Sequence, residues 1–437
     1  MLAAVHRRTM TTTVLVVGSG GREHAIARAL DASPDAAIHA AVSNRNPGIV
    51  RLAEDVEELD TGDPAAVADY ADRVGADVAV VGPEGPLDAG VVDALEDRGV
   101  YGFGPTAEQA RIETDKAWAR RFMRDEGIPG TPDFAIFDDP EEAAAYVESY
   151  DGDLALKPRG LTGGKGVRVM GDQVTREEAV EYVRESGYDE WVLEERLVGE
   201  EFTLQAFVAD GELRSMPAVQ DHKRAYEGDE GPNTGGMGSY SDAGHVLPFM
   251  TREEYDAALE VMEATVDALP GYRGILYGQF MLTSEGPKVV EFNARFGDPE
   301  AMNVLPVMET DLLDVVTGAR DGALPDVSFR ERATVCKYAV PEGYPTDPEA
   351  GAEITLDEDA AGDALVYYAS VDERDGRLYT TTSRSLGVVG VDDTIATAEA
   401  QAEDALGMLG EGLRVRHDIG TEALVQRRID HMREIRG

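Results

Sequence analysis

The chain has 437 residues, and its 85 acidic and 40 basic side chains give it a net charge of −45. This charge excludes nucleic acid as a default partner, because binding to a phosphate backbone requires a basic footprint. It does not indicate disorder, since 43% of the residues are hydrophobic and apolar residues recur with helix and strand periods.

The acidic residues are spread along the whole length, and only six of the 40 basic residues are lysines. Such a composition is typical of proteins from salt-loving microbes, where salt screens self-repulsion. We therefore expect a halophilic source; the alternative is an ordinary acidic protein of a low-salt cytosol. Lys116, Lys157, Lys165 and Lys223 fall in the segments described below, where phosphate would need them.

Cysteine content and hydropathy bear on location. The single cysteine, Cys336, excludes a disulfide framework and fits a reducing compartment. No apolar run reaches the roughly 18 residues that span a membrane. We expect a cytoplasmic protein without a membrane partner, as a monomer or weak oligomer.

The first predicted elements alternate between short apolar strands and helices. Strands are expected at Val14–Val17, Ile38–Val42 and Val78–Val81, with helices near Glu23–Leu30 and Ala65–Val74. This alternation predicts a parallel α/β sheet with covering helices.

A glycine cluster, Gly18-Ser-Gly20-Gly21-Arg22-Glu23-His24, follows the first strand and opens a helix. Backbone N–H groups at such a turn can bind an anion at the positive end of the helix. Glu23 stands at the last position of a dinucleotide fingerprint, and no acid ends the second strand, so we favour phosphate over NAD. A tight turn without a ligand is the alternative.

A second glycine-rich segment connects predicted strands at Ala155–Lys157 and Val167–Met170. It reads Lys157-Pro-Arg-Gly160-Leu-Thr-Gly163-Gly164-Lys165-Gly166. It is not a Walker A loop, because Gly166 rather than Ser or Thr follows the lysine. We expect a hairpin flap whose N–H groups and Lys165 contact phosphates while Lys157 reaches in from the strand. The alternative is a mobile surface hairpin.

An acid-rich helix near Arg176–Ser186 precedes a strand expected at Trp191–Glu194. That strand ends in Glu194-Glu195-Arg-Leu197 and is followed by Gly199-Glu-Glu201. The backbone of such a strand end can bind an adenine edge, and a nearby carboxylate can bind the ribose. The signal is weak alone, because acidic strand ends are common in this chain.

The segment Glu291-Phe-Asn293-Ala-Arg295-Phe-Gly-Asp298-Pro-Glu300 ends a series of strands expected at Phe202–Val208, Gly278–Leu282 and Lys288–Phe292. Glu291 and Asn293 lie two apart on a strand and therefore point the same way. A carboxylate and an amide oxygen form half of a Mg²⁺ site that water and nucleotide phosphates complete. Arg295 continues on that face as a fork for a carboxylate or phosphate. A solvated strand face is the alternative.

Two further segments are Gln220-Asp221-His222-Lys223-Arg224 and Gly231-Pro-Asn233-Thr234-Gly235-Gly236-Met237-Gly238. Four glycines in eight residues let a backbone approach a ligand closely, the alternative being a disordered linker. Helices are expected at Arg252–Leu269 and Pro299–Val307. After Arg332 we expect strands, a hairpin turn at Asp375-Gly376 and a helix over Ala396–Leu409.

Taken together, these segments resemble the phosphoribosylamine–glycine ligases (glycinamide ribonucleotide synthetases), ATP-grasp enzymes of purine synthesis. The match covers nearly the whole chain from Val14, and its most specific parts are Gly231 to Gly238 with Glu291 to Glu300. The resemblance implies an α/β fold with four parts: an N-terminal doubly wound domain (1–112), an ATP-grasp main domain (113–129 and 198–328), a small lid (130–197) and a β-rich C-terminal domain (329–437).

The resemblance also implies the reaction. ATP, glycine and 5-phosphoribosylamine give ADP, phosphate and glycinamide ribonucleotide through glycyl phosphate, with Mg²⁺ or Mn²⁺ as the metal. Such chemistry is mainly positioning and charge neutralisation, so glycine loops, lysines and a metal are expected rather than a nucleophilic side chain.

The site residues implied by the resemblance fall into groups. Expected at the reaction centre are Arg295, Lys223 and Asp221. Expected to bind ATP are Lys116, Lys157, Gly163, Gly164, Lys165, Gly166, Glu194, Glu195, Leu197 and Glu201. Expected to bind the other substrates are Gly20, Gly21, Arg22, Glu23, Asn46, Glu84, Asn233, Thr234, Gly235, Gly236, Met237 and Asp298. Expected as metal ligands are Glu291 and Asn293.

The chain departs from the family pattern in several places, one of which is the unusual segment Val335-Cys336-Lys337-Tyr338, from which no site residue is carried over. Asn44-Arg-Asn46-Pro47-Gly48 stands where the family has Pro-Gly-Asn-Ala-Gly. Gln279 lies near the position at which many ATP-grasp enzymes have a metal-binding Glu. Thr382-Ser-Arg384-Ser385 replaces the usual Asn-Gly-Gly-Arg, and no site residue is carried over from there.

Two other functions share part of this pattern. Another ATP-grasp ligase would share the lid and the Glu291–Asn293 pair, but not Gly231–Gly238 together with Gln220–Arg224. A non-catalytic nucleotide sensor could keep Lys157 but has no need of both Glu291 and Asn293.

The charge of the chain predicts a salt dependence. Carboxylates repel one another over the Debye length, which is about 10 Å at 0.1 M salt and about 3 Å at 1 M. We predict that the thermal midpoint and the ligase activity both rise as KCl increases from about 0.1 M into the molar range. Thermal melts and initial rates over a KCl series measure the two quantities. A midpoint that stays constant or falls would contradict the halophilic interpretation and leave the enzymatic one untouched.

Overall fold

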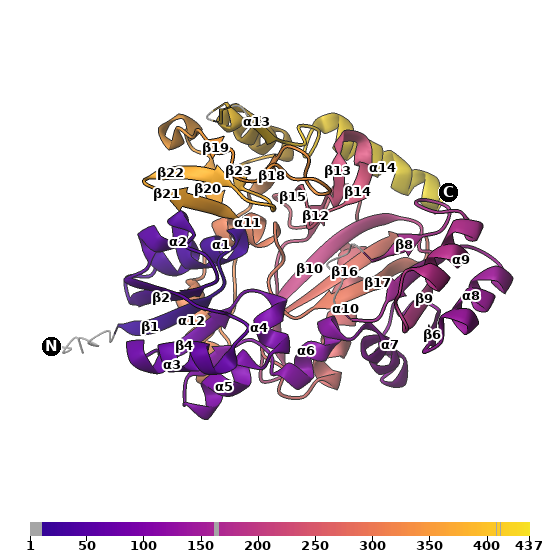
Figure 1. Ribbon diagram of the computed structural model, residues 1–437, viewed down its shortest axis with the longest axis horizontal. Helices are drawn as coiled ribbons and strands as arrows, with labels where there is room; N and C mark the ends of the chain where they lie inside the picture. Colours follow the sequence, from indigo (N-terminus) through magenta and orange to yellow (C-terminus); the bar gives the residue numbers. More distant parts are fainter. Residues whose placement is uncertain (1–10, 161–165, 408, 411) are drawn as a thin grey trace.

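The computed structural model describes residues 11–160, 166–407, 409–410 and 412–437 (Figure 1). We keep the predicted bounds as names for its regions: N-terminal (to 112), central (113–129 and 198–328), lid (130–197) and C-terminal (from 329). The α/β fold predicted from the sequence is confirmed, with a parallel sheet at the N-terminal end and mostly antiparallel strands elsewhere.

The N-terminal region is built on five parallel strands in the order β3-β2-β1-β4-β5, which is a doubly wound arrangement. Its elements are β1 Thr12–Val17, α1 Gly21–Asp31, β2 Ala36–Val42, α2 Pro47–Leu52, β3 Asp55–Glu58, α3 Pro64–Val74, β4 Val78–Val81, α4 Glu84–Asp88, α5 Val91–Asp97 and β5 Tyr101–Phe103. The predicted strands are confirmed, whereas β3 and β5 carry little sequence signal because one is mostly acidic and the other has three residues. The reversal of order at β1 and β4 places Gly18–Gly20 at the topological switch point.

The lid region is a small antiparallel sheet in the order β6-β9-β7-β8 with two helices packed on it. After α6 Ala107–Thr114 and α7 Lys116–Asp125, its elements are β6 Phe134–Phe137, α8 Pro140–Ser149, β7 Leu154–Pro158, β8 Arg168–Val169, α9 Arg176–Glu185 and β9 Trp191–Glu195. Trp191 is completely buried in a core that belongs to this region alone. The predicted pairing of β7 with β8 is confirmed. The predicted phosphate-contacting residues Gly163, Gly164 and Lys165 lie outside the described residues.

A ten-stranded sheet joins the central and C-terminal regions, with the main path β17-β16-β10-β12-β15-β18-β23-β20. Its strands are β10 Glu200–Ala209, β11 Glu212–Ser215, β12 Val219–Asp221, β15 Gly238–Ser241, β16 Gly274–Thr283, β17 Gly286–Asn293, β18 Ala333–Pro341, β20 Leu365–Tyr368, β23 Leu386–Asp392 and β24 Leu413–Arg414. Because β15 hydrogen-bonds to β18, the backbone ladder crosses the predicted boundary between residues 328 and 329.

Smaller elements surround this sheet. They are β13 Arg224–Tyr226, η1 Glu227–Asp229, β14 Glu230–Asn233, α10 Arg252–Ala268, α11 Ala301–Val304, η2 Leu305–Val307, α12 Leu312–Arg320, β19 Glu353–Ile354, η3 Glu358–Ala361, β21 Val371–Arg374, β22 Arg377–Thr380, α13 Ile395–Leu406 and α14 Glu422–Arg436. The predicted hairpin turn at Asp375-Gly376 joins β21 to β22. The helix predicted over Pro299–Val307 is shorter, since only Ala301–Val304 is α-helical and Pro306 lacks the N–H that would continue it.

Asn46 fastens the N-terminal region to the C-terminal region. Its Nδ2 donates to the carbonyl oxygens of Ser19 at 2.9 Å and Tyr368 at 2.7 Å, while its Oδ1 accepts from the Gly48 N–H at 2.9 Å. His24 adds a contact, because its Nδ1 accepts from the Tyr368 N–H at 2.9 Å. The first sheet is thus held against β20 by buried hydrogen bonds.

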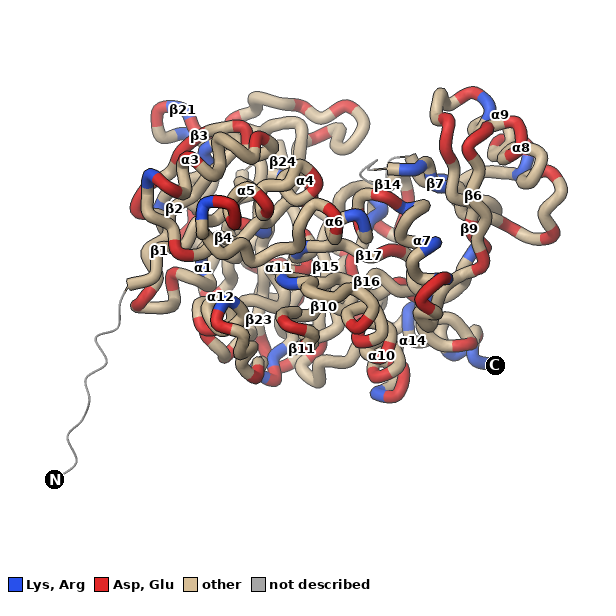
Figure 2. The backbone as a smooth tube through the Cα atoms, turned by 90° about the horizontal axis from the view of Figure 1, so that it is seen from below, with Lys and Arg blue, Asp and Glu red and all other residues tan. Residues whose placement is uncertain are grey.

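Acidic residues occur in every region (Figure 2). They lie on helices, strands and loops, with basic residues between them along much of the chain. The structure therefore agrees with the even spread of acids in the sequence. In the described part of the chain, no helix is both long enough and apolar enough to cross a membrane.

Lys337 on β18 is completely inaccessible and has three partners. Its Nζ lies 2.5 Å from a Glu399 carboxylate oxygen, 2.6 Å from one of Glu403, and 2.9 Å from the His417 carbonyl oxygen. A buried charge that loses its partners is strongly destabilising. This ammonium group therefore ties β18 to α13 and to the segment before α14.

We predict that Lys337→Met destabilises the protein by on the order of 3 kcal/mol, the lower part of the range for breaking a buried ion pair, because both glutamates keep some contact with water. A lower thermal midpoint than that of the wild type measures the loss. Lys288→Met is the matched control, since Lys288 is partly exposed and lies 3.6 Å from the exposed Glu285. Equal midpoints for the two variants would contradict the structural role of Lys337.

Candidate functional site

Lys157 lies at the end of β7, where the lid region meets β17. Its Nζ is 2.8 Å from Glu194 Oε2, and Arg120 of α7 pairs with the same carboxylate, Nε to Oε1, at 2.7 Å. The three side chains are only 4–7% exposed. Burial would raise the pKa of Glu194, but Arg120 and Lys157 lower it below its usual value. An ionised carboxylate thus holds two cations at the seam between the lid and central regions.

A β-bulge in β17 supplies a carbonyl group to these cations. The register of β17 against β16 shifts at Val290, which has no partner in the ladder. Its carbonyl oxygen accepts from Lys157 Nζ at 2.9 Å and from Arg120 Nη2 at 2.7 Å. Because of the bulge, Val289 and Phe292 both reach the same core although they lie three positions apart. Strict strand alternation therefore fails just before the predicted metal ligands.

Lys116 and the flap lie beside this cluster. The Nζ of Lys116, at the start of α7, donates to the carbonyl oxygen of Gly160. At the other described end of the flap, the carbonyl oxygen of Gly166 accepts from the Tyr182 hydroxyl at 2.9 Å. A small cavity of about 20 Å³ is lined by Lys116, Lys157, Glu194 and Glu291, among others. Three predicted ATP-binding residues, Lys116, Lys157 and Glu194, are therefore brought together.

The predicted adenine-binding strand end divides its side chains between two faces. Glu194 points to Lys157, whereas Glu195 Oε1 accepts from the Asp133 N–H at 3.0 Å and lies 3.9 Å from Lys288 Nζ. Leu197 lies in the connection to β10 and is partly buried. The Glu195 N–H also donates to the Asp133 carbonyl oxygen at 2.9 Å, so Glu195 is bonded to Asp133 through both its side chain and its main chain.

Glu291 belongs to a row of polar contacts. Lys223 Nζ is 4.0 Å from Glu291 Oε1 and donates to Gln279 Oε1 at 2.5 Å. Gln279 Nε2 in turn donates to Glu201 Oε2 at 2.8 Å. Burial would raise the pKa of Glu291, but Lys223 and the nearby ammonium groups lower it. The result is an ionised carboxylate that is still 39% exposed.

Glu291 and Asn293 suit a hard divalent cation, because both offer oxygen atoms. Asn293 Oδ1 accepts from Arg295 Nη2 at 3.2 Å. Among the described residues no three His, Cys, Asp or Glu side chains are grouped to hold a metal. A cation at Glu291 and Asn293 would therefore need oxygens from water and a nucleotide as well. The amide oxygens of Asn293 and Gln279 each accept one hydrogen bond from a cationic side chain, and each keeps a second lone pair.

Arg295 is surrounded by carboxylates of the central and N-terminal regions. Its Nη2 lies 2.9 Å from Glu113 Oε1, and its Nε lies 3.5 Å from Glu84 Oε2. Burial raises the pKa of Glu113, whereas burial of Glu84 is outweighed by Arg295 and Arg22, which lower its pKa. Two predicted site residues, Glu84 and Arg295, therefore lie side by side. Glu113 of α6 also contacts Arg295, although no pattern in the sequence had indicated it.

Asp221 closes β12 next to a second carboxylate. Its Oδ1 accepts from the His222 N–H at 2.7 Å. Burial and the charge of Glu300 raise the pKa of Asp221 well above its usual value. Glu300 itself accepts from the Tyr277 hydroxyl at 2.8 Å. The pair is a candidate for proton exchange or for binding an amino group.

The first glycine turn faces Asp298 across the boundary between regions. A side-chain Cβ at Gly20 would lie 3.7 Å from Asp298 Oδ2, and one at Gly21 would lie 2.5 Å from the Tyr338 hydroxyl oxygen. Glu23 Oε2 accepts from the Gly20 N–H at 2.6 Å. Arg22 pairs with Glu23 at 2.5 Å and donates to the Phe296 carbonyl oxygen. Glu23 and Arg22 thus shape and dock the turn, which needs glycine because Tyr338 lies so close.

The glycine-rich loop after β14 packs against the same place. Gly236 has a φ of 110°, and a Cβ there would lie 2.7 Å from Asp221 Oδ1, so only glycine fits. Thr234 Oγ1 donates to the Lys223 carbonyl oxygen at 2.8 Å and accepts from the Gly236 N–H at 3.0 Å. The loop and the Asp221–Lys223 segment are therefore one hydrogen-bonded unit, with Asn233 at the end of β14.

Arg384 and Tyr338 belong to the site but were not expected from the sequence. Arg384 Nη1 donates to the carbonyl oxygens of Gly235 at 2.7 Å and Gly236 at 3.0 Å. The Tyr338 hydroxyl donates to Asp298 Oδ1 at 2.6 Å. Both residues come from the C-terminal region, so no local spacing links them to Asp298. The available signals were two segments that depart from the family pattern, Val335-Cys336-Lys337-Tyr338 and Thr382-Ser-Arg384-Ser385.

Two of the residues expected to contact substrates have side chains that lie in the interior. Met237 is completely buried among core residues, so its side chain does not face the site. Asn46 is likewise inaccessible, and its amide already bonds within the protein, as described above. Sequence spacing could not separate these roles, because a motif residue that packs looks the same as one that binds.

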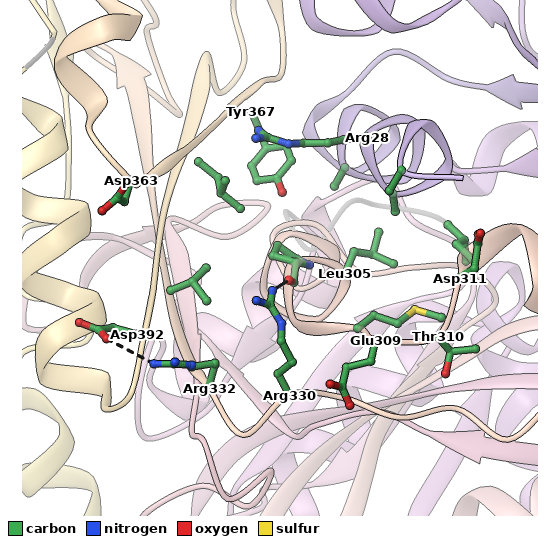
Figure 3. A pocket seen from close by; sticks show the side chains of 18 of the residues that line it. Arg28, Leu305, Glu309, Thr310, Asp311, Arg330, Arg332, Asp363, Tyr367 and Asp392 are labelled. Atoms are coloured by element: carbon green, nitrogen blue, oxygen red, sulfur yellow. Dashed lines mark hydrogen bonds and ion pairs between the residues drawn. The ribbon is translucent and has the colours of Figure 1, made fainter. Parts of the chain in front are cut away.

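A cavity of about 830 Å³ lies elsewhere, between α1, the η2–α12 segment and the C-terminal region (Figure 3). Arg28 lies over the ring of Tyr367, 5.7 Å from its centre, and Arg332 is 3.7 Å from Asp392. No predicted site residue lines this cavity. A choice of site by cavity volume alone would therefore miss all of the predicted site residues.

Comparison with known families covers most of the chain. Phosphoribosylglycinamide synthetase, N domain, matches residues 12–113; the ATP-grasp (A) domain of that family matches residues 114–301; and its C domain matches residues 334–422.

Individual relatives agree with these matches. The chain is 54% identical over 428 residues to the phosphoribosylamine–glycine ligase of Methanoregula boonei, covering 97% of this chain and 100% of that protein. It is 52% identical over 434 residues to that of Methanosarcina barkeri, with coverages of 97% and 100%. The crystal structure of the phosphoribosylamine–glycine ligase from Thermotoga maritima has a TM-score of 0.79 at 29% identity, covering 93% of this chain and 100% of that one. The biotin carboxylase domain of the Hydrogenobacter thermophilus 2-oxoglutarate carboxylase, with a TM-score of 0.72 at 18% identity and coverages of 97% and 94%, shares the fold alone.

We predict that Asp221→Asn is more stable than the wild type near neutral pH. The raised pKa of Asp221 means that the folded state binds its proton more tightly than the unfolded state does. Stability is therefore lost as pH rises from the usual value of 3.8 to the folded pKa, and the amide avoids this loss. At a pH above both the unfolded and the folded pKa, each unit by which folding raises the pKa lowers the stability of the wild type by about 1.4 kcal/mol.

Thermal midpoints of both proteins between about pH 5 and about pH 8 measure this effect, and the difference should widen as pH rises. A variant that is less stable than the wild type over the whole range would contradict the prediction and show that Lys223 requires the charge.

Proposed function

The chain belongs to the phosphoribosylamine–glycine ligase family, and from this premise we propose how its own residues join glycine to 5-phosphoribosylamine. The reaction consumes ATP and forms glycinamide ribonucleotide, ADP and phosphate in purine biosynthesis. The proposal rests on one observation: four predicted site residues lie close together near the ends of three strands. They are Lys157 of β7, Lys223 just after β12, and Glu291 and Asn293 of β17.

ATP lies between the lid and central regions in this proposal. Lys157 and Lys116 face its phosphates, helped by the flap from Gly163 to Gly166 with Lys165. The backbone from Glu194 to Leu197 borders the adenine, and Glu201 is the carboxylate for the ribose. Support comes from the buried cation cluster, since one carboxylate holds Arg120 and Lys157 in place before an anion arrives.

Glu291 and Asn293 would hold Mg²⁺ or Mn²⁺ together with phosphate oxygens. Such a cation, when bound, neutralises charge on the transferring phosphoryl group. Both proposed ligands are on β17, and among the described residues no group of three acidic, His or Cys side chains could hold a metal, so we propose that metal binding depends on the nucleotide. The buried Cys336 thiol fits the reducing cytoplasm that we propose as the location.

In the first step a glycine carboxylate oxygen attacks the γ-phosphorus of ATP. The bond between this phosphorus and the bridging oxygen breaks, so that glycyl phosphate and ADP are formed. Arg295 and Lys223 face this position and balance the negative charge. Both are cations at neutral pH, because the surrounding carboxylates raise the pKa of each despite burial. Binding and orientation supply most of the rate in such a step.

In the second step the amine of 5-phosphoribosylamine attacks the carbonyl carbon of glycyl phosphate, and phosphate leaves. The attacking nitrogen gives up a proton. Asp221 is suited to receive it, because its raised pKa brings the carboxylate closer to neutral pH. Gly20, Gly21 and Asp298 border the side from which the sugar phosphate would approach, and Asn233 to Gly236 cover it.

The test is an assay with ATP, Mg²⁺, glycine and 5-phosphoribosylamine in which each component is omitted in turn. We predict that Glu291→Gln lowers kcat about 100-fold or more, since the charge stabilisation that a metal ligand provides amounts to several kcal/mol. Glu285→Gln is the matched control, because Glu285 lies in the same β16–β17 hairpin and is 77% exposed. Wild-type turnover by Glu291→Gln would contradict the assignment.

The omission series also separates the other functions. ADP formation that needs a carboxylate other than glycine would indicate a different ATP-grasp ligase. Nucleotide binding without any ADP formation would indicate a sensor.

A further inference from the structure

Asp298 is held on one side by the C-terminal region. Its Oδ1 accepts from the Tyr338 hydroxyl at 2.6 Å and lies 3.3 Å from Arg384 Nη2. Arg384 Nη1 also donates to the main-chain carbonyl oxygen of Asp298 at 3.1 Å. Within the described part of the chain these contacts reach Oδ1 and the backbone, whereas Oδ2 faces Gly20. One oxygen of the carboxylate is therefore anchored and the other is directed at the first glycine turn.

Arg384 holds more than Asp298. The same nitrogen that bonds Asp298 donates to the Gly235 and Gly236 carbonyl oxygens, and the guanidinium lies 4.4 Å from the centre of the Tyr338 ring. The planar guanidinium of Arg384 thus contacts three carbonyl oxygens, one carboxylate and one aromatic ring. The ammonium group of a lysine could not make this set of contacts. The side chains of Arg384 and Asp298 are 14% and 15% exposed, so both are largely removed from water.

Contacts that only attached the C-terminal region to the central region would not have to fix the orientation of the Asp298 carboxylate. Here the hydroxyl and the guanidinium fix its orientation, and hydrogen bonds to a charged group are stronger than neutral ones. Burial raises the pKa of Tyr338 well above its usual value, so the hydroxyl keeps its proton and acts as the donor. The carboxylate can therefore present Oδ2 without reorganising.

We propose that Arg384 and Tyr338 are positioning residues that aim Asp298 Oδ2 at the amino group of 5-phosphoribosylamine. The inference rests on the proposed function. Oδ2 faces the turn of the N-terminal region, away from the Lys157–Glu194 cluster at which ATP is proposed to lie. Glycine must meet the γ-phosphate on the nucleotide side, so the amine that approaches from the N-terminal side belongs to the sugar phosphate.

The experiment compares Tyr338→Phe and Arg384→Gln with the wild type, varying one substrate at a time. The KM for 5-phosphoribosylamine should rise about tenfold or more, because Tyr338→Phe removes a hydrogen bond to the carboxylate that orients the amine and Arg384→Gln removes an ion pair with it. The KM values for ATP and glycine should change less than about twofold, well below the effect of removing a hydrogen bond. Arg377→Gln is the control, since Arg377 lies in the same region, is 64% exposed and should leave all three values unchanged.

A KM for 5-phosphoribosylamine that stays at the wild-type value in Tyr338→Phe would overturn the inference, and so would an equal rise in the KM for glycine. Tyr338→Phe removes a single hydroxyl group, so it carries the test if Arg384→Gln folds poorly. A wild-type protein that forms no glycinamide ribonucleotide would instead defeat the proposed function, which keeps the two failures apart.

Discussion

The pairing of buried charges in the site with charges of opposite sign is the constraint on which most of the arrangement depends. Glu194 is held between Arg120 and Lys157, and Arg295 lies between Glu84 and Glu113. Removal of one partner would leave an unpaired charge away from water, at a cost of about 3–5 kcal/mol. In a chain with a net charge of −45 this pairing gathers cations where an anionic nucleotide must enter.

The same pairing explains the acids around the site. Carboxylates raise the pKa of Lys223 and so keep its ammonium group charged, while that group lowers the pKa of Glu291. Asp221 is the exception, because its nearest carboxylate, Glu300, disfavours its ionised form. One site thus contains carboxylates kept ionised to bind cations and one whose proton affinity is raised.

No single region contains the site. The parallel sheet supplies the glycine turn, the lid supplies Lys157, the central strands supply Glu291 and Asp221, and the C-terminal region supplies Tyr338 and Arg384. These parts stay in register because β15 pairs with β18 in one continuous sheet and because Asn46 bonds to β20. A loss of packing far from the reaction centre would therefore also disturb its geometry.

Much of this could be predicted from the sequence alone. Strand and helix periods placed β1, β2, β4, β7, β9, β10, β16, β17 and α10 close to their observed bounds, because these are long or strongly patterned segments. The two-residue spacing of Glu291 and Asn293, the flap beginning at Lys157 and the family resemblance identified the chemistry. Local signals of this kind depend on neighbouring residues only, so the sequence contains them directly.

Tertiary structure decided the rest. The bulge at Val290 turns its carbonyl group to Lys157 and Arg120, although alternation predicts a regular strand. Packing directed Asn46 and Met237 into the interior and brought Arg384 to Asp298, across 86 positions of sequence. Composition, periodicity and motif spacing thus determined the fold class, and the resemblance carried by the motifs indicated the reaction. Which side chains face the substrates depended on contacts between distant segments, because burial and hydrogen bonding are settled only when those segments pack together.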